Sequence, residues 1–334
     1  MSKTQALIDR LQQAGFSEHF LNATLPPWAA TEQSPSGQMM LRLLLARRLN
    51  LDPETLMDDE AALTFLQSGP IKFKHMRLGP GQRKDTLTAY ALGVARILLS
   101  AAAGHPVTLV PVASSLRSSI LASGRDNIGF GDVLSACWAL GIPVIHLRLF
   151  PAQAKGVTAV AVRLGQRHAI LVARESGVPA QYMFHVAHEL GHIALGHLKD
   201  AAAIVDADPH DEANAGEPLI DDDEERAADE YAQELLTGVR HFVVSRNLSG
   251  AAGTARELAD RAKQLGAEMQ VDPGHVVMNY GFSTGEWPLA MAAAKLAPGQ
   301  DESLSSLVNR VLWEQLPERT GDQSEHFLRA VAPV

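Results

Sequence analysis

The segment His188-Glu189-Leu190-Gly191-His192 lies in a mostly apolar run and constrains the fold of this chain more than any other feature. Two histidines four positions apart lie on the same face of a helix, one turn from each other. Because an unpaired imidazole is costly to bury, both rings need a partner, and a metal ion is one way to supply it. The sequence therefore predicts a buried helix over 179–198 that offers both imidazoles to one zinc ion, with Glu189 placed to act on a zinc-bound water.

The same pattern also has a purely structural interpretation, in which a core helix carries two histidines by chance. A catalytic zinc ion needs a third protein ligand and one open position. The metzincin arrangement would place a histidine at position 198 and a glycine at position 194, but the chain has Leu198 and Ala194 there. That arrangement is excluded. His197 is out of register for a ligand and suits a supporting position near the helix end.

A second helix, expected over 221–236, supplies carboxylates that can complete the site. Its acidic first turn suits the positive end of the helix dipole. Glu225 is the candidate third ligand, and Asp229 lies one turn further on the same face. Asp229 can accept the outer N–H of one ligand histidine and fix its tautomer. A solvated acidic helix start is the alternative interpretation of this pair.

The order of the remaining segments predicts an α+β fold with a small β-sheet between helical regions. Strands are expected over 143–150, 157–164 and 168–173, the last as a sheet edge that can pair with an extended substrate. A basic loop is expected over 70–84 and an exposed acidic loop over 199–220. Further helices are expected over 1–22, 38–50, 86–102, 131–140, 255–268, 273–280, 286–295 and 303–315.

Composition is that of an ordinary globular protein. Of the 334 residues, 46% are hydrophobic, and no apolar run is long enough to span a bilayer. The N-terminus lacks the apolar segment of a secretory signal, so a cytoplasmic location is expected. The single cysteine, Cys137, excludes an internal disulfide and a cysteine-rich metal site. A net charge of −9 argues against nonspecific nucleic-acid binding by the whole molecule.

Taken together, the two site helices resemble those of the ImmA/IrrE-type zinc metallopeptidases. The resemblance covers residues 130–240. It rests on His-Glu-Leu-Gly-His with Leu195-Gly196-His197 after it, on Leu140-Gly141-Ile142-Pro143-Val144, and on Glu225-x-x-Ala228-Asp229-x-Tyr231-Ala232-x-Glu234-Leu235-Leu236. The resemblance implies zincin-type active-site helices, a Zn2+ ion held by His188, His192 and Glu225, and Glu189 as the catalytic residue.

The resemblance also implies an activity: hydrolysis of a peptide bond in a regulatory protein, such as an XRE-type transcriptional repressor, in transcription regulation or stress response. In the expected mechanism, a zinc-bound water attacks the scissile carbonyl, while Glu189 takes the proton of that water and passes it to the leaving amine. Four residues are candidates to assist the oxyanion: Tyr182, His185, His210 and Tyr280.

Three regions are predicted along the chain: a helical N-terminal region over 1–104, a zinc metallopeptidase domain over 105–240 and a helical C-terminal region over 241–334. Residues 38–62 resemble the last helices of an XRE-type helix-turn-helix domain, with an α-helical cap as the simpler alternative. The alternative function is therefore a non-cleaving DNA-binding regulator or antitoxin-like protein whose metallopeptidase-like domain senses or binds. Basic residues over 72–84 could contact phosphate or an acidic partner, with a solvated face as the simpler interpretation.

Overall fold

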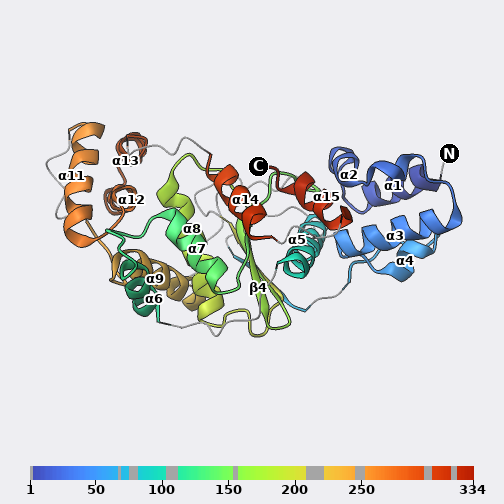
Figure 1. Cartoon of the computed structure of the whole chain (residues 1–334), viewed down its shortest axis with the longest axis horizontal. Coiled ribbons are helices and arrows are strands. Elements are labelled where there is room, and N and C mark those ends of the chain that lie inside the picture. The colour runs from blue at the N-terminus through green and yellow to red at the C-terminus, as the bar shows by residue number, and fades with distance from the viewer. Residues whose placement is uncertain are drawn as a thin grey trace.

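The N-terminal helices form one end of the molecule, and a sheet with its covering helices forms the middle (Figure 1). The computed structural model describes residues 3–66, 69–74, 82–102, 112–152, 157–207, 222–244, 253–296, 303–316 and 322–334. The N-terminal elements are α1 (Lys3–Gln13), α2 (Glu18–Thr24), the 3-10 helix η1 (Pro27–Ala30), α3 (Pro35–Leu49) and α4 (Pro53–Met57). The expected helix over 1–22 is thus two helices, because Gly15 adopts a left-handed φ of 99° between them.

The sheet has five strands and is mixed. They are β1 (Ile71–Lys74), β2 (Val144–His146), β3 (Val157–Leu164), β4 (Arg167–Val172) and β5 (Ala203–Ala207). The order across the sheet is β1-β5-β3-β4-β2, with parallel pairs at the two ends and antiparallel pairs in the middle. Helices and this sheet together make the architecture α+β, as expected.

Three expectations about the sheet are wrong. The run over 168–173 is not an edge, because β4 lies between β2 and β3 and pairs with both. The basic segment over 70–84 is not all loop, because its first residues form β1 and pair with β5. The acidic segment over 199–220 is not all loop either, because β5 lies inside the sheet between β1 and β3. Both missed strands are short, and their tertiary pairing decides their structure more than local propensity does.

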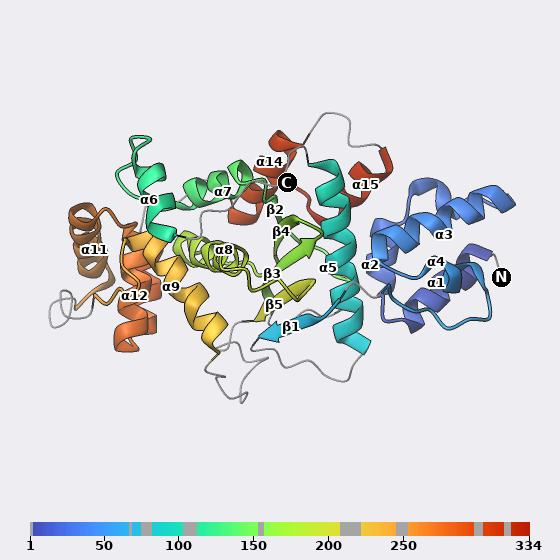
Figure 2. The same cartoon turned by 90° about the horizontal axis from the view of Figure 1, so that it is seen from below.

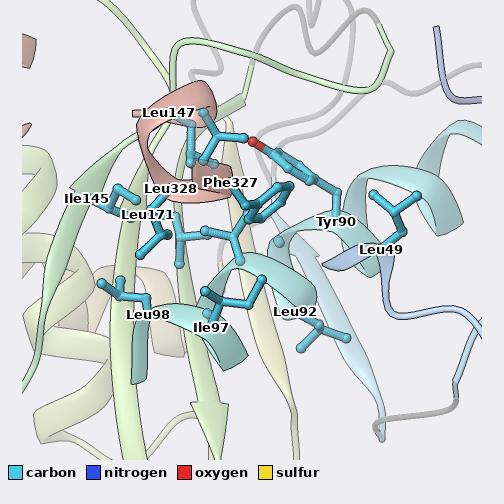
Figure 3. Close-up of a cluster of buried hydrophobic side chains, with 14 of the residues drawn as sticks. Leu49, Tyr90, Leu92, Ile97, Leu98, Ile145, Leu147, Leu171, Phe327 and Leu328 are labelled. Carbon is cyan, nitrogen blue, oxygen red and sulfur yellow. The ribbon is translucent and has the colours of Figure 1, made fainter. Parts of the chain in front are cut away.

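Alternate side chains of the sheet pack against helices on its two faces. Val160 and Leu171 face α5 (Gln82–Ala101) and the C-terminal helix α15 (Asp322–Val331), in the apolar cluster that Figure 3 shows. Ala161 and Ile170 face α8 (Pro179–Ala194) on the other side. The expected site helix is therefore held against the sheet by apolar packing, although it ends at Ala194 instead of continuing to position 198.

The remaining helices are α6 (Ala113–Leu121), α7 (Phe130–Ala139), α9 (Asp223–Thr237), α11 (Ala255–Met269), α12 (Pro273–Thr284), α13 (Trp287–Ala294) and α14 (Leu304–Gln315). Of these, α7, α9 and α12 pack against α8, α14 packs against β2, and α11 lies at the far end of the molecule beyond α12 (Figure 2). Helices α6 and α15 were not expected, whereas the other expected helices are confirmed to within a few residues. Within the described ranges, no helix has the length and hydropathy needed to cross a membrane.

Elements from all three predicted regions contribute to the middle of the molecule. Strand β1 and helix α5 come from residues 1–104, and both are part of the sheet layer or pack on it. Helix α14 comes from residues 241–334 and lies against β2, where the side chain of Asn309 accepts a hydrogen bond from His146 N and donates one to His146 O. The sheet therefore joins segments that are far apart in the sequence.

Candidate metal centre

Helices α8 and α9 pack closely because Gly191 leaves room for the backbone of α9. A Cβ atom at position 191 would lie 3.1 Å from Ala228 O and 3.2 Å from the Ala228 Cα. On the same stretch of α8, His188 and His192 are buried, and their Nε2 atoms lie 3.0 Å apart. The close approach of α9 then brings a carboxylate to these two nitrogens.

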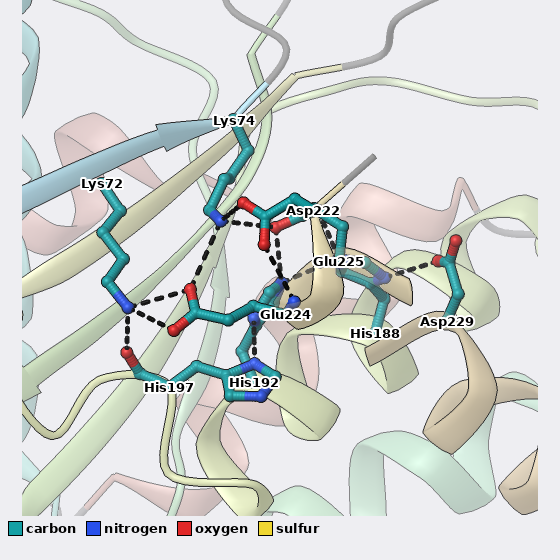
Figure 4. Close-up of polar contacts among 9 residues, drawn as sticks. All are labelled: Lys72, Lys74, His188, His192, His197, Asp222, Glu224, Glu225 and Asp229. Carbon is teal, nitrogen blue, oxygen red and sulfur yellow. Dashed lines mark hydrogen bonds and ion pairs between the residues drawn. The ribbon is translucent and has the colours of Figure 1, made fainter. Parts of the chain in front are cut away.

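That carboxylate belongs to Glu225, which lies between the two histidines (Figure 4). Glu225 Oε2 is 3.4 Å from His188 Nε2, and Glu225 Oε1 is 3.4 Å from His192 Nε2. A tetrahedral metal with bonds of about 2.0–2.1 Å places its ligand atoms about 3.4 Å from each other. The three side chains therefore have the spacing and the donor atoms to hold one metal ion, as a buried His-His-Glu group.

The outer ring nitrogens of both histidines also have partners. Asp229 Oδ1 lies 2.8 Å from His188 Nδ1, and His197 Nδ1 lies 2.8 Å from His192 Nδ1. A partner on Nδ1 that accepts its proton leaves the lone pair of Nε2 for a metal. Gly196, with a left-handed φ of 75°, turns the chain after α8 so that His197 reaches back to His192. Asp229 and His197 thus each contact one of the two candidate ligand histidines.

The charges of the three candidate ligands are strongly coupled. Burial opposes protonation of His188, but hydrogen bonding with Asp229 and Glu225 outweighs it and raises the pKa of His188 well above its usual value. Burial also disfavours the ionised form of Glu225, yet its hydrogen bonds with the two histidines hold its pKa well below the usual range. Burial lowers the pKa of His192 to about 4. Glu225 and His192 are thus in the forms that bind a metal, an anionic carboxylate and a neutral imidazole, whereas His188 would release a proton when a metal binds.

Glu189 is fully buried and faces the sheet. Neither of its carboxylate oxygens makes a hydrogen bond of normal geometry among the described residues. Burial raises the pKa of Glu189 well above its usual value, and Asp206 on β5 adds to the rise. His188 and the backbone of Ala161 in β3 oppose part of this shift. A buried carboxylate without such a bond is uncommon, because its desolvation is not compensated.

Two lysines of β1 reach the acidic start of α9 (Figure 4). Lys72 Nζ donates to Glu224 at 2.6 Å and to His197 O at 2.9 Å. Lys74 forms ion pairs with Asp222 and with Glu224, and its Nζ lies 3.5 Å from Glu225 Oε1. These lysines neutralise the acidic turn that carries the third candidate ligand. These two lysines therefore make ion pairs within the molecule instead of forming a solvated basic face. Residues 75–81 of the same basic segment lie outside the described residues.

A cleft of about 830 Å³ opens beside the centre, between α8 and α9 on one side and α12 and α13 on the other. His188, Glu225 and Asp229 line it, as do Asp206 and His275. Neither Asp206 nor His275 was expected from the sequence. Nothing local marks Asp206, because β5 reads Ala-Ile-Val-Asp-Ala without alternation of apolar and polar residues, and nothing local marks His275, since it comes from a helix of the C-terminal region.

The four oxyanion candidates lie in different surroundings. His185 lines the cleft. Tyr182 is buried in the core, where its ring meets Phe130 edge-on. Tyr280 donates its hydroxyl to Glu286 and does not line the cleft. His210 lies outside the described residues. Only His185 among the three described candidates is thus brought to the cleft.

The N-terminal segment that resembles a helix-turn-helix tail turns its arginines inward. Arg42 is buried and donates to Leu56 O. Arg48 is buried and donates to Thr24 O at 2.6 Å and to Gln323 O at 2.5 Å. These two guanidinium groups therefore serve intramolecular contacts in α3.

Comparison of the sequence and structure with protein-family models, with curated proteins and with solved structures finds no match to any of them.

Proposed function

We propose that this chain is a zinc-dependent endopeptidase of the ImmA/IrrE type, with zincin-type helices α8 and α9. One observation carries the proposal: the convergence of two imidazole nitrogens and one carboxylate at tetrahedral spacing, next to a cleft. Two histidines and a glutamate are a donor set found in catalytic zinc sites, which keep a fourth position open. Zinc bound there would polarise a scissile carbonyl and lower the pKa of water in the site toward neutrality.

Glu189 is the proposed general base. Its carboxylate oxygens make no hydrogen bond of normal geometry with the described residues, so they have the capacity to accept one from a water molecule in the site. A metal ion bound by the neighbouring ligands would favour the ionised form of Glu189, which is the form that accepts a proton. In the proposed reaction, Glu189 takes a proton from the attacking water and returns it to the leaving nitrogen. Asp229 holds the tautomer of His188 during both steps.

The test uses the full chain loaded with zinc, together with an XRE-type repressor encoded next to its gene. We expect one zinc per chain by mass spectrometry and cleavage of the repressor by the unmodified protein. Glu189→Gln is the matched variant, because it keeps all three ligands and removes only the base. It should retain zinc and lose cleavage.

Two outcomes contradict the proposal. A zinc content well below one per chain after reconstitution would remove the metal centre. Full zinc content with equal inactivity of both proteins, together with tight binding to an operator duplex, would favour the non-cleaving regulator instead.

A further inference from the structure

The wall of the cleft that faces the metal centre is rich in large apolar side chains. Six of them line it: Phe184, Phe242, Met278, Phe282, Trp287 and Met291. The ring of Phe282 is 61% exposed and meets the ring of Trp287 edge-on at 4.7 Å. An aromatic side chain this exposed adds little to the core. A concave site lined by aromatic side chains next to a few polar groups is typical of ligand binding.

His275 adds an unusual polar group to the same wall. It is only 5% exposed, and its ring stacks between Phe184 and Phe242 at centroid distances of 6.2 and 6.1 Å. Neither of its ring nitrogens has a hydrogen-bond partner among the described residues. Because burial lowers the pKa of His275 to about 4, the neutral ring offers one donor and one acceptor at pH 7. Such a group is costly unless a ligand completes its hydrogen bonds.

The cleft also joins this wall directly to the candidate ligands. Phe184 lies one helical turn before His188 on α8, and their ring centroids are 6.3 Å apart. The carboxylates of Asp206, Glu225 and Asp229 lie at the metal end of the cleft, so an acidic group there would meet like charges. Arg174 also lines the cleft but already has an interaction of its own, so the chemistry of the lining favours an uncharged, bulky group beside the metal.

We propose that the cleft is a specificity site for one large apolar side chain, such as leucine or phenylalanine, adjacent to the bond that is cleaved. The side chain lies between Phe184 and the pair formed by Phe282 and Trp287, and His275 hydrogen-bonds to the main chain of the substrate. This inference rests on the proposed peptidase function, because it places the apolar side chain beside a reacting peptide bond.

The test compares two hydroxamates that differ only in the side chain: N-acetyl-L-leucine hydroxamate and N-acetylglycine hydroxamate. Both can bind zinc through the hydroxamate group, and both carry an amide for His275. Titration calorimetry on the zinc-loaded full chain should show about 10- to 100-fold tighter binding of the leucine compound, as expected for burial of an isobutyl group. His275→Phe, which keeps the ring stack, should weaken both compounds by about fivefold through one lost hydrogen bond.

Phe282→Ser should reduce the preference for leucine to about threefold or less, since this exposed ring supplies part of the apolar surface. Leu296→Ala is the matched control: Leu296 follows α13, is 55% exposed and does not line the cleft, so the preference should be unchanged.

Equal binding of the two hydroxamates to the unmodified protein would overturn the inference and leave the metal centre standing, and this comparison needs no variant to fold. An unchanged preference in Phe282→Ser would also overturn it. Failure to retain zinc, with no hydroxamate binding at all, would instead overturn the proposed function.

Discussion

The N-terminal helices and the candidate metal centre both bury polar side chains, but these side chains differ in their hydrogen bonds. In α3, the guanidinium of Arg48 donates to two backbone carbonyls and lies 5.2 Å from the centre of the Phe327 ring. In α8, the carboxylate of Glu189 is just as buried, yet it makes no hydrogen bond of normal geometry with the described residues. His275 in α12 is in a similar position.

This difference in hydrogen bonding distinguishes buried polar groups that stabilise the fold from those that can still bind a ligand. Arg48 donates from both of its terminal nitrogens, although its Nε makes no hydrogen bond with the described residues, and in this way it joins α3 to the C-terminal helix α15. A buried polar group with no hydrogen bond at all lowers stability and is tolerated where function needs it.

Removal of a candidate ligand should have the largest effect. Zinc-binding free energies of about 10–16 kcal/mol, shared over the ligands of a site, suggest that His192→Ala weakens zinc binding roughly a thousandfold. Asp229→Asn, which only changes the partner of His188, should cost about 10- to 100-fold. Competition with a chromophoric chelator measures both. Equal affinities for the two variants would mean that His192 is not a ligand.

Replacement of the buried guanidinium of Arg48 should destabilise the fold. In Arg48→Met, two carbonyls lose their charged donor, and we expect the free energy of unfolding to fall by about 3 kcal/mol. Urea denaturation followed by circular dichroism measures this change. The neighbouring Arg47 is exposed, so Arg47→Met should change the free energy by less than about 0.5 kcal/mol. Similar values for the two variants would contradict a structural role for Arg48.

The pH dependence of stability should reveal His275. Its pKa is about 4 in the folded protein, below the ordinary value of 6.5. The unfolded chain therefore takes up a proton first, and stability is lost as the pH falls from about 6.5 to 4. Urea denaturation of the metal-free protein should show that His275→Phe loses about 2 kcal/mol less than the unmodified chain over this interval.

A matched control isolates that effect from the other histidines. The side chain of His241 is 77% exposed, so His241→Phe should leave the pH dependence unchanged. Parallel pH curves for His275→Phe and the unmodified chain would show that His275 is not held neutral by burial.

Removal of the buried Glu189 carboxylate should give the smallest effect, and it should raise stability instead of lowering it. Burial raises the pKa of Glu189, so at a pH above that pKa Glu189→Gln removes a buried charge and the metal-free protein should become more stable by about 1 kcal/mol. Thermal and urea unfolding in the presence of a chelator measure this gain. A clear loss of stability would place Glu189 with Arg48, among the groups that hold the fold together.

Local spacing allowed much of the centre to be predicted from the sequence. The four-residue interval between His188 and His192 places both rings on one helix face, whatever surrounds the helix. The same interval between Glu225 and Asp229 explains why one reaches the metal position and the other reaches His188. Most helices were predictable for the same reason, since their apolar periodicity and their caps are local.

Tertiary structure alone decided which distant residues complete the centre. Lys74 and Asp222 are 148 positions apart, and they meet only because β1 pairs with β5 at the edge of the sheet. His275 reaches the cleft only because α12 packs near α8. Strands as short as β1 and β5 have weak local signals, since their stability comes from pairing with other segments. The sequence alone therefore determined the two helical halves of a candidate metal centre, and long-range packing decided which charges and which cleft surround it.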